Sequence, residues 1–278
     1  MRRLILFTAA VLLCAGLFAQ QGKVTTRKYR LADFTDKITK VVMSGDEILD
    51  AALRQEVVDQ WTASPFEFCS LDDYNTLKGS DAWYFLLVTA GQAKGEEKPT
   101  VQFLTLEKGG AETGENIPLR TEILSLPLCP AEGGSGRELV FLPALVKGIQ
   151  DFTLRAMASE KVAYTGTNWF NDNYDAKGRI KRIYLAWEDL SASVTEKDKA
   201  RYLDEDIILC EADEADKVYA DRTFNTLVSY SVSGGTWSYQ LLIEAETDTI
   251  YYLRKHTVTT RSGAGFITDD LRKMAKGR

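Results

Sequence analysis

The chain of 278 residues has a single histidine, and this limits the chemistry that the sequence offers. Histidine supplies most general bases and many metal ligands near neutral pH. His256 stands next to Lys255 in residues 251–256, a stretch that reads as a strand with His256 exposed on its polar side. A Ser-His-Asp or Cys-His site would have to include this residue. The sequence therefore predicts no catalytic residue of that kind.

The cysteines do not form a metal-binding pattern either. Cys69, Cys129 and Cys210 stand 60 and 81 residues apart, whereas a zinc site needs closely spaced pairs. We interpret them as buried thiols that act as small apolar side chains. A disulfide between Cys69 and Cys129 is the alternative, which an oxidising compartment permits.

Three further stretches begin like binding motifs without completing them. Residues 133–136, Gly-Gly-Ser-Gly, precede a helix as in anion sites, but they lack the Lys-Ser/Thr of a P-loop and the dinucleotide spacing. Residues 171–175 begin like a calcium loop, yet Ala176 and Arg182 occupy its glycine and glutamate positions. The acidic residues of 204–216 favour a solvated face over a carboxylate pair. We expect no cofactor and no metal ion.

Trp169 and Phe170 are the best candidates for a binding surface. They stand in a stretch that reads as a polar loop, and an exposed aromatic pair is costly unless a partner covers it. The sequence therefore predicts Trp169 and Phe170 as residues that contact a protein partner.

The N-terminus has the pattern of a secretory signal peptide. Arg2 and Arg3 precede an apolar run over 4–13, and small residues lead to Ala19. The run is shorter than the roughly 20 residues of a membrane span. We expect cleavage near Ala19, at an Ala-Gln junction that resembles those of exported proteins of the Bacteroides group. Lipidation of Cys14 is the weaker alternative, because Leu13 is not the small residue that a lipobox needs.

The expected mature chain is acidic and has no second long apolar stretch. The full chain has 34 Lys and Arg against 40 Asp and Glu, and the signal segment removes two basic residues and no acidic ones. Such a balance repels phosphate backbones, so nucleic-acid binding is not expected. No transmembrane segment is expected in the mature chain, which we place in the periplasm or outside the cell.

The remaining sequence contains an internal duplication. In the first half, strands are expected at 40–43, 66–69, 83–89 and 100–106, with helices at 46–61 and 70–77. In the second half, strands are expected at 182–185, 206–210, 226–233 and 238–245, with helices at 195–203 and 214–220. Val42 to Cys69 spans 27 residues, and Tyr184 to Cys210 spans 26. Order, element type and spacing agree, which indicates one unit present twice.

These elements predict an α+β fold of two similar βαβαββ units, each a mixed sheet with helices mainly on one face. A further strand at 249–258 and a C-terminal helix at 267–274 complete the second unit. A long connector helix at 137–160 joins the units, and Pro143 should kink it or begin its regular part. The expected boundaries are 1–19 for the signal peptide, 20–130 for the first unit, 131–178 for the linker and connector helix, and 179–278 for the second unit.

The first unit resembles a known periplasmic module. A long helix, the strand Phe66–Cys69 and a second helix opened by Ser70-Leu71-Asp72-Asp73-Tyr74 are similar to the N-terminal domain of TolB. The related modules of CsgG and of LpoB-type activators share this pattern. The resemblance covers about 65 residues in each half, and the β-propeller that follows in TolB is absent from this sequence. It implies an interaction module that serves an envelope assembly.

The sequence therefore favours a non-catalytic binding or scaffolding protein of the cell envelope, whose partners are other envelope proteins. The alternative is a hydrolase, or a binder of small ligands or carbohydrates, with a carboxylate-based site in the cleft between the units, because glycosidases work with two carboxylates and no histidine. An inhibitor or immunity protein is a third option that the sequence does not separate from the first. The fold alone does not decide among them.

Overall fold

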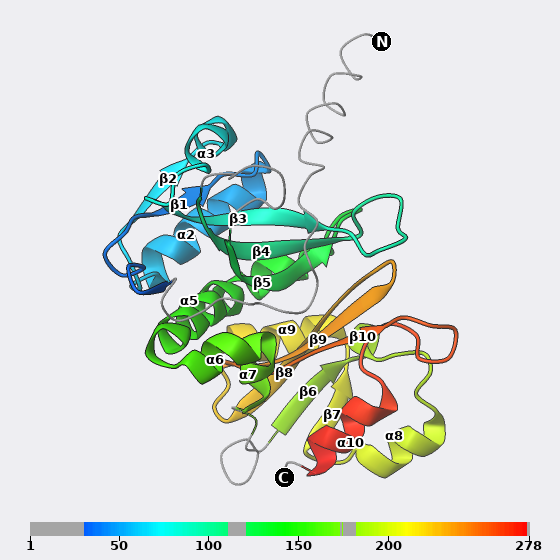
Figure 1. Ribbon diagram of the computed structural model, residues 1–278. Coiled ribbons are helices and arrows are strands. Elements are labelled where there is room, and N and C mark those ends of the chain that lie inside the picture. The colour runs from blue at the N-terminus through cyan, green and yellow to red at the C-terminus, as the bar shows by residue number, and fades with distance from the viewer. Residues whose placement is uncertain (1–30, 111–120, 173, 175–181, 277–278) are drawn as a thin grey trace.

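The computed structural model describes residues 31–110, 121–172, 174 and 182–276 as two five-stranded mixed sheets. Figure 1 shows the first sheet above the second, with helices α5 and α9 between them. The predicted signal peptide lies outside the described residues. Among the described residues, no helix combines the length and the apolar character needed to cross a membrane.

The first unit has strand order β2-β1-β3-β4-β5. Its strands are β1 (Thr39–Val42), β2 (Phe66–Cys69), β3 (Tyr84–Gly91), β4 (Val101–Lys108) and β5 (Thr121–Pro130). Its helices are α2 (Glu47–Gln60) and α3 (Leu71–Leu77). Both helices begin close to the predicted positions. The Asp46 carboxylate caps α2 by accepting from the N–H groups of Ile48 and Leu49, and Ser70 forms a capping box with Asp73 at the start of α3.

The second unit repeats this arrangement. Its sheet has order β7-β6-β8-β9-β10, with β6 (Arg182–Ala186), β7 (Ile207–Cys210), β8 (Thr226–Gly234), β9 (Trp237–Glu244) and β10 (Ile250–Thr257). Its helices are α8 (Glu196–Tyr202), α9 (Ala212–Ala220) and α10 (Thr268–Lys276). Cys69 pairs with Val42 at the end of β2, and Cys210 pairs with Ala186 at the end of β7. Two similar units are therefore present, and the two cysteines are equivalent.

The structure corrects two details of the expected unit. The first sheet has a third antiparallel strand that was not expected, because β5 follows β4 just as the expected strand β10 follows β9, so each unit is βαβαβββ. The two helices of a unit also lie on opposite faces of its sheet, not mainly on one. Val41 packs with α2, and its neighbour Val42 packs with Tyr74 of α3. The chain passes from β1 to β2 at the edge of the sheet and then returns past β1 to β3. Because both crossovers are right-handed but run in opposite directions, their helices lie on opposite faces.

The two units turn opposite faces toward the shared core. In the first unit the α2 face points inward, since Leu49, Leu53 and Val57 belong to the large common cluster. In the second unit the α9 face points inward through Ala215 and Tyr219, whereas α8 and α10 cover a separate cluster on the outer face. The duplicated units are thus alike in topology but not in the face that each one buries.

The connector is three helices in place of the single one predicted. They are α4 (Arg137–Val140), α5 (Leu142–Ala158) and α6 (Glu160–Thr165), with a break at Phe141. Pro143 stands in the first turn of α5, where a missing N–H is tolerated. Ten of the residues of α5 are buried, which is the pattern of a helix enclosed on more than one side.

Two side chains of α5 show how it contacts both units. The Gln150 side-chain oxygen accepts from the backbone N–H groups of Thr62 and Ala63, at 2.6 and 2.9 Å, just beyond the end of α2. At Gly148, a Cβ atom would stand 2.8 Å from Ile250 of the second unit and 3.1 Å from Leu126 of the first. This glycine allows both sheets to approach the helix at the same level.

We predict that Gly148→Val destabilises the whole chain by about 1–3 kcal/mol, the usual cost of overpacking a filled core. Because Leu126 and Ile250 belong to different units, the loss should appear as one shifted transition in urea unfolding. Gly79→Val is the matched control, since a Cβ there meets no atom within 4 Å. Two separate transitions, with only one of them shifted, would contradict a shared core.

Candidate functional site

The structure contradicts the expected exposure of the predicted aromatic pair. Trp169 and Phe170 begin the short helix α7 (Trp169–Asp172), which follows the 3-10 turn Gly166–Asn168. Phe170 is 1% exposed and its ring stacks on that of Phe152, while Trp169 is partly buried against the same ring. The expected polar loop is a helical turn whose aromatic side is part of the core. The exposure on which the predicted partner contact rests is therefore absent at Phe170 and only partial at Trp169.

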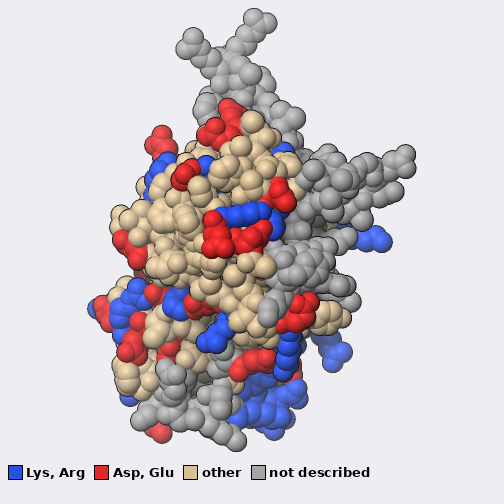
Figure 2. All heavy atoms as spheres, turned by 60° about the vertical axis from the view of Figure 1, so that its left-hand side comes forward, with Lys and Arg blue, Asp and Glu red and all other residues tan. Residues whose placement is uncertain are grey.

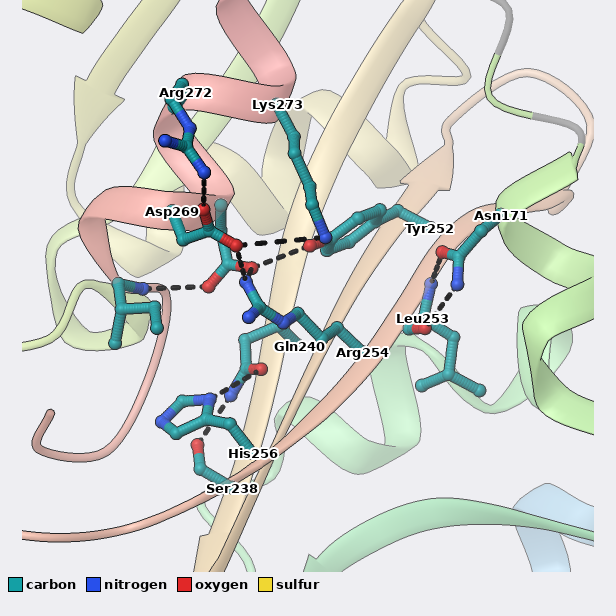
Figure 3. A network of polar contacts seen from close by, with 12 residues as sticks. Asn171, Ser238, Gln240, Tyr252, Leu253, Arg254, His256, Asp269, Arg272 and Lys273 are labelled. Atoms are coloured by element: carbon teal, nitrogen blue, oxygen red, sulfur yellow. Dashed lines mark hydrogen bonds and ion pairs between the residues drawn. The ribbon is translucent and has the colours of Figure 1, made fainter. Parts of the chain in front are cut away.

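The residue that follows them protects an edge of the second sheet. The Asn171 side chain accepts from the Leu253 N–H and donates to the Leu253 carbonyl, both at 3.0 Å (Figure 3). An amide placed in this way supplies the two hydrogen bonds that a neighbouring strand would make with β10. In the stretch 171–175, which begins like a calcium loop, Asn171 therefore has a structural role. Residues 173 and 175 lie outside the described residues.

His256 is held in a network and is not exposed as expected. Its Nδ1 lies 3.1 Å from the Gln240 side-chain oxygen (Figure 3). Its Nε2 lies 3.1 Å from the Gly263 carbonyl. Further along the same strand, Tyr252 donates to Asp270, and Arg254 pairs with both Asp269 and Asp270. These contacts attach α10 and the loop before it to the sheet, which gives His256 a structural role.

The three cysteines are free thiols, so the alternative of a disulfide between Cys69 and Cys129 is wrong. Cys69 lies in β2 and Cys129 in β5, at opposite edges of one sheet. Four strand spacings of about 4.8 Å separate these edges, far beyond the reach of a disulfide. Burial raises the pKa of all three thiols, to about 11 for Cys129 and Cys210.

The glycine-rich segment is occupied by a side chain of the protein itself. The Glu138 carboxylate accepts from the Gly136 N–H at 3.0 Å and would collide with a Cβ atom at Gly134. The acidic stretch is similarly dispersed, since Asp216 pairs with Arg137 and Asp204 accepts from the N–H groups of the turn before β7. Among the described residues, no group of His, Cys, Asp and Glu side chains is arranged to hold a metal ion.

Arg137 is an important residue that the sequence did not single out. Its guanidinium pairs with Asp189 at 3.0 Å and with Asp216 at 2.9 Å, and it donates to the Ser229 carbonyl. Asp189 is 2% exposed and also accepts from the Ser229 hydroxyl and the Ser231 N–H. Against the effect of burial, the carboxylates of Asp189 and Asp216 raise the pKa of Arg137, while burial raises the pKa of Asp189. The connector is thus attached to the second unit by buried, hydrogen-bonded ion pairs.

We predict that Arg137→Met destabilises the chain by about 3–5 kcal/mol, because it leaves the buried Asp189 without a counter-charge. Adding Asp189→Asn should recover part of the loss. Lys98→Met, which removes an exposed pair with Glu132, should cost less than about 1 kcal/mol. Urea unfolding of the variants checks this order, and equal losses for Arg137→Met and Lys98→Met would contradict it.

One pair of carboxyl groups, Glu107 buried and Glu122 half-buried, is relevant to the alternative of a hydrolase. Glu107 and Glu122 are directly opposite in the β4–β5 register. Glu107 accepts from the Tyr74 hydroxyl at 2.8 Å and Glu122 from the Ser125 hydroxyl at 2.7 Å. Burial raises the pKa of Glu122. The pair lies within the first sheet, on the face that carries α3, and not in a cleft between the units.

A different group of residues lies where the units meet, and we call it the seam. It comprises Glu56 of α2, residues 219–225 at the end of α9, and the turn 245–248 between β9 and β10. Glu56 lies close enough to Arg222 and Asp248 for their charges to act on its carboxyl group. The seam therefore brings together one helix of the first unit and two turns of the second.

The backbone of the seam is strained in an unusual way. Arg222, Asn225 and Asp248 are the non-glycine residues with positive φ among the described residues, at 55°, 53° and 57°. Arg222 ends α9 in a Schellman motif, since its N–H donates to the Tyr219 carbonyl and the Thr223 N–H to that of Val218. Glycine is the usual residue at this position, so the arginine is present at a cost.

Side-chain contacts explain why an arginine stands there. The Arg222 guanidinium pairs with Asp248 and donates to the Ala245 carbonyl at 3.4 Å. The Tyr219 hydroxyl donates to the same carboxylate of Asp248, which is 6% exposed. Burial and the adjacent Asp248 charge raise the pKa of Tyr219, which stays protonated. These bonds fix the two turns of the second unit against each other.

The fixed turn presents an aromatic ring to solvent. Phe224 is 68% exposed although it lies between two left-handed residues, and its carbonyl accepts from the Thr226 hydroxyl. Other large apolar side chains are exposed on helices or carry a polar atom, namely Ile48, Val58, Leu154, Tyr164 and Trp187. Phe224 is thus a fully apolar ring on a rigid turn at the seam.

On the face in Figure 2, acidic and basic side chains are interspersed on the upper part, and basic ones gather toward the lower end.

The sequence does contain a signal for this turn. Residues 221–226, Asp-Arg-Thr-Phe-Asn-Thr, place an aromatic among turn-forming residues between a helix and a strand. An aromatic pair in a polar stretch pointed instead to Trp169 and Phe170, whose flanking residues are helical. Comparison of the chain with protein-family models, curated proteins and solved structures gave no match.

We predict that Glu56→Gln stabilises the chain at pH 7 by less than about 1 kcal/mol. Burial, followed by the charges of Asp59 and Asp248, raises the pKa of Glu56. The folded chain therefore binds this proton more tightly than the unfolded chain, and stability falls as the pH rises through the pKa of Glu56. The gain from Glu56→Gln should vanish near about pH 3, where both states carry a protonated carboxyl group.

Urea unfolding at the two pH values measures this difference. Glu97→Gln is the control, because Glu97 is exposed in the loop between β3 and β4. If the gain is equal at both pH values, ionisation of Glu56 does not destabilise the folded chain, which contradicts the prediction.

Proposed function

We propose that this chain is an exported protein of the cell envelope that binds another envelope protein at the seam without catalysing a reaction. The observation that carries the proposal is Phe224, an exposed apolar ring held on a rigid turn. Exposed aromatics of this kind are characteristic of protein–protein contacts, where a partner's surface removes them from water. Strain that the surrounding contacts maintain is found preferentially at functional positions.

Two sequence features support the location and the class of partner. The N-terminal pattern of Arg2, Arg3 and the apolar run 4–13 favours export with cleavage near Ala19, and hence a periplasmic or secreted chain. The resemblance of the first unit to the modules of TolB, CsgG and LpoB-type activators favours an envelope assembly as the setting. The fixed geometry of the two units suits a protein that offers a preformed surface.

We predict that a photo-crosslinking residue, p-benzoylphenylalanine, forms an adduct with one envelope protein when it replaces Phe224 in intact cells. The same residue at Tyr164 is the matched control, because Tyr164 is an aromatic that is 82% exposed on the connector. Untagged wild-type chain should compete with the adduct, whereas the Phe224→Ser chain should not. An adduct that also forms at position 164, or that Phe224→Ser removes equally well, would contradict the proposal.

The alternative of a carboxylate-based hydrolase has one specific observation in its favour, the Glu107–Glu122 pair. A glycosidase needs one carboxyl group with a raised pKa beside a second carboxylate, and Glu122 meets the first condition. Hydrolysis of cell-wall or capsular polysaccharide by the wild type, lost in Glu122→Gln while the fold is retained, would establish this function in place of binding.

A further inference from the structure

We infer that the open edge of strand β2 binds an extended segment of a partner as an added antiparallel strand, with an acidic side chain of that segment placed against Arg54. This surface lies on the first unit and goes beyond the proposed function, because it does not involve Phe224. Figure 1 shows β2 at the outer edge of the first sheet. The inference comes from a comparison of the edges of the two sheets.

Three of the four sheet edges carry contacts from side chains of the chain itself. The edge of β10 is covered by the Asn171 amide. At β7, the Asp204 carboxylate accepts from the Ile207 N–H at 3.0 Å, and the Asp204 N–H donates to the Ile207 carbonyl. At β5, the Tyr230 hydroxyl of the second unit donates to the Leu128 carbonyl. Contacts of this kind hinder pairing with another strand.

The edge of β2 has no such cover. The carbonyls of Pro65 and Cys69 accept from N–H groups of Thr39 and of the residue that follows β1. By alternation, the N–H and carbonyl groups of Phe66 and Phe68 point away from β1. In the described part of the chain, no side chain or further strand bonds to these groups. They form a row of donors and acceptors that an extended peptide matches.

The duplication shows which side chain is missing. Cys69 and Cys210 are equivalent, and the residues six positions before them are Ala63 and Asp204. Asp204 covers the edge of its strand, whereas alanine has no polar side-chain atom that could do so. Both edge strands have four residues, so their length does not explain the difference. The first unit therefore lacks the cover that the second unit has.

The side chains beside this edge indicate what an added strand would meet. Phe66 and Phe68 lie on the face that carries α2, half-buried, with their ring centres 5.6 Å apart. The guanidinium carbon of Arg54 on α2 lies 4.6 Å from the centre of the Phe68 ring. Val58 follows one helical turn later on the same side of α2 and is 59% exposed. Alternate side chains of an added strand would face this apolar surface and its arginine.

Charge selects the class of segment. In the described part of the chain, the Arg54 guanidinium contacts the Phe68 ring and has no carboxylate partner. A stacked guanidinium keeps its N–H groups available, so an aspartate or glutamate opposite Phe68 would complete its contacts. A basic segment would meet like charge. Edge-to-edge pairing with a second copy would bring two Arg54 side chains to the same face, which disfavours that occupant.

Amide exchange tests whether the edge is open. The Ile207 amide proton, which is bonded to Asp204, should exchange about threefold to tenfold more slowly than those of Phe66 and Phe68. Asp204→Ala should remove this difference at Ile207. Equally slow exchange at Phe66 and Phe68 in the chain alone would refute the open edge.

The binding test uses the peptide acetyl-Val-Thr-Asp-Thr-Val-amide, which as a strand presents valine and aspartate on one face and threonine on the other. In a titration of the isotope-labelled chain, it should shift the amide signals of 66–69 and Arg54 and slow exchange at Phe66 and Phe68. The counterpart with lysine in place of aspartate should bind about threefold to tenfold more weakly, because an attraction becomes a repulsion. Equal affinities, or shifts confined to other residues, would refute the inference.

N-methylation of the peptide separates backbone pairing from side-chain contact. In the antiparallel arrangement, the N–H of the aspartate opposite Phe68 points at β2, and the threonine N–H groups point away. Methylation of the aspartate nitrogen should weaken binding about threefold to tenfold, the effect of one hydrogen bond. Methylation of a threonine nitrogen is the matched control and should leave the affinity unchanged. Equal losses would refute strand addition, and a larger loss for threonine would refute the antiparallel direction.

A variant of the chain tests the role of the arginine. Arg54→Gln should abolish most of the preference for aspartate over lysine in the peptide. Arg201→Gln is the matched control, because Arg201 is exposed on α8, the equivalent helix of the second unit, and contacts the Tyr202 ring. If the two substitutions change the preference equally, Arg54 does not select the acidic segment.

The results at this edge and at the seam are independent. Peptide binding at β2 without a crosslink at position 224 would support the inference while the proposed function fails. A crosslink at position 224 without peptide binding at β2 would have the opposite meaning. If the signals of 66–69 shift with chain concentration in the absence of peptide, and sedimentation shows a dimer, the occupant of the edge is a second copy and the inference is refuted.

Discussion

The structure depends on the burial of one helix, α5, between two sheets. Because both units contact it, α5 can carry few exposed polar residues, and ten of its residues are buried. Gly148 lets Leu126 and Ile250 approach from opposite units, and Gln150 satisfies the backbone beyond the end of α2. Each unit would otherwise leave one apolar face of its sheet in water. The connector is therefore the common core of the protein and not a linker between two independent domains.

This constraint explains why two similar units are used differently. If both units turned the same face toward α5, each would bury the face that carries its first helix, α2 or α8. Instead, the first unit buries its α2 face and the second its α9 face. The second unit consequently needs another cover for its outer face, and α10 supplies it through the pairing of Arg254 with Asp270. Phe141 stacks on Tyr230 at 4.7 Å, and so the break in the connector fills the gap on the inner face.

The sequence was a good guide to local structure and a poor guide to what each side chain meets. Asp46, Ser70 and Thr195 were readable as helix starts because capping depends on residues two or three positions away. The sheet elements followed from local patterns, and the duplication from the agreement of the spacings Val42 to Cys69 and Tyr184 to Cys210. Phe170 and Arg137 depend instead on tertiary contacts with Phe152 and Asp189, which no local pattern specifies. Ile48 shows the same limit, since it fits the apolar stripe of α2 and yet is 69% exposed.

The candidate site is coupled to this core by continuous contacts. The Tyr219 ring packs on Phe141 at 4.8 Å, and its hydroxyl donates to Asp248, which in turn holds Arg222 in its left-handed conformation. A left-handed residue other than glycine costs about 1 kcal/mol or more, so it persists only where such contacts outweigh the cost. The position of Phe224 is thus set by the packing of the connector. A surface determined in this way cannot move independently of the two units, and its rigidity lowers the entropic cost of binding a partner.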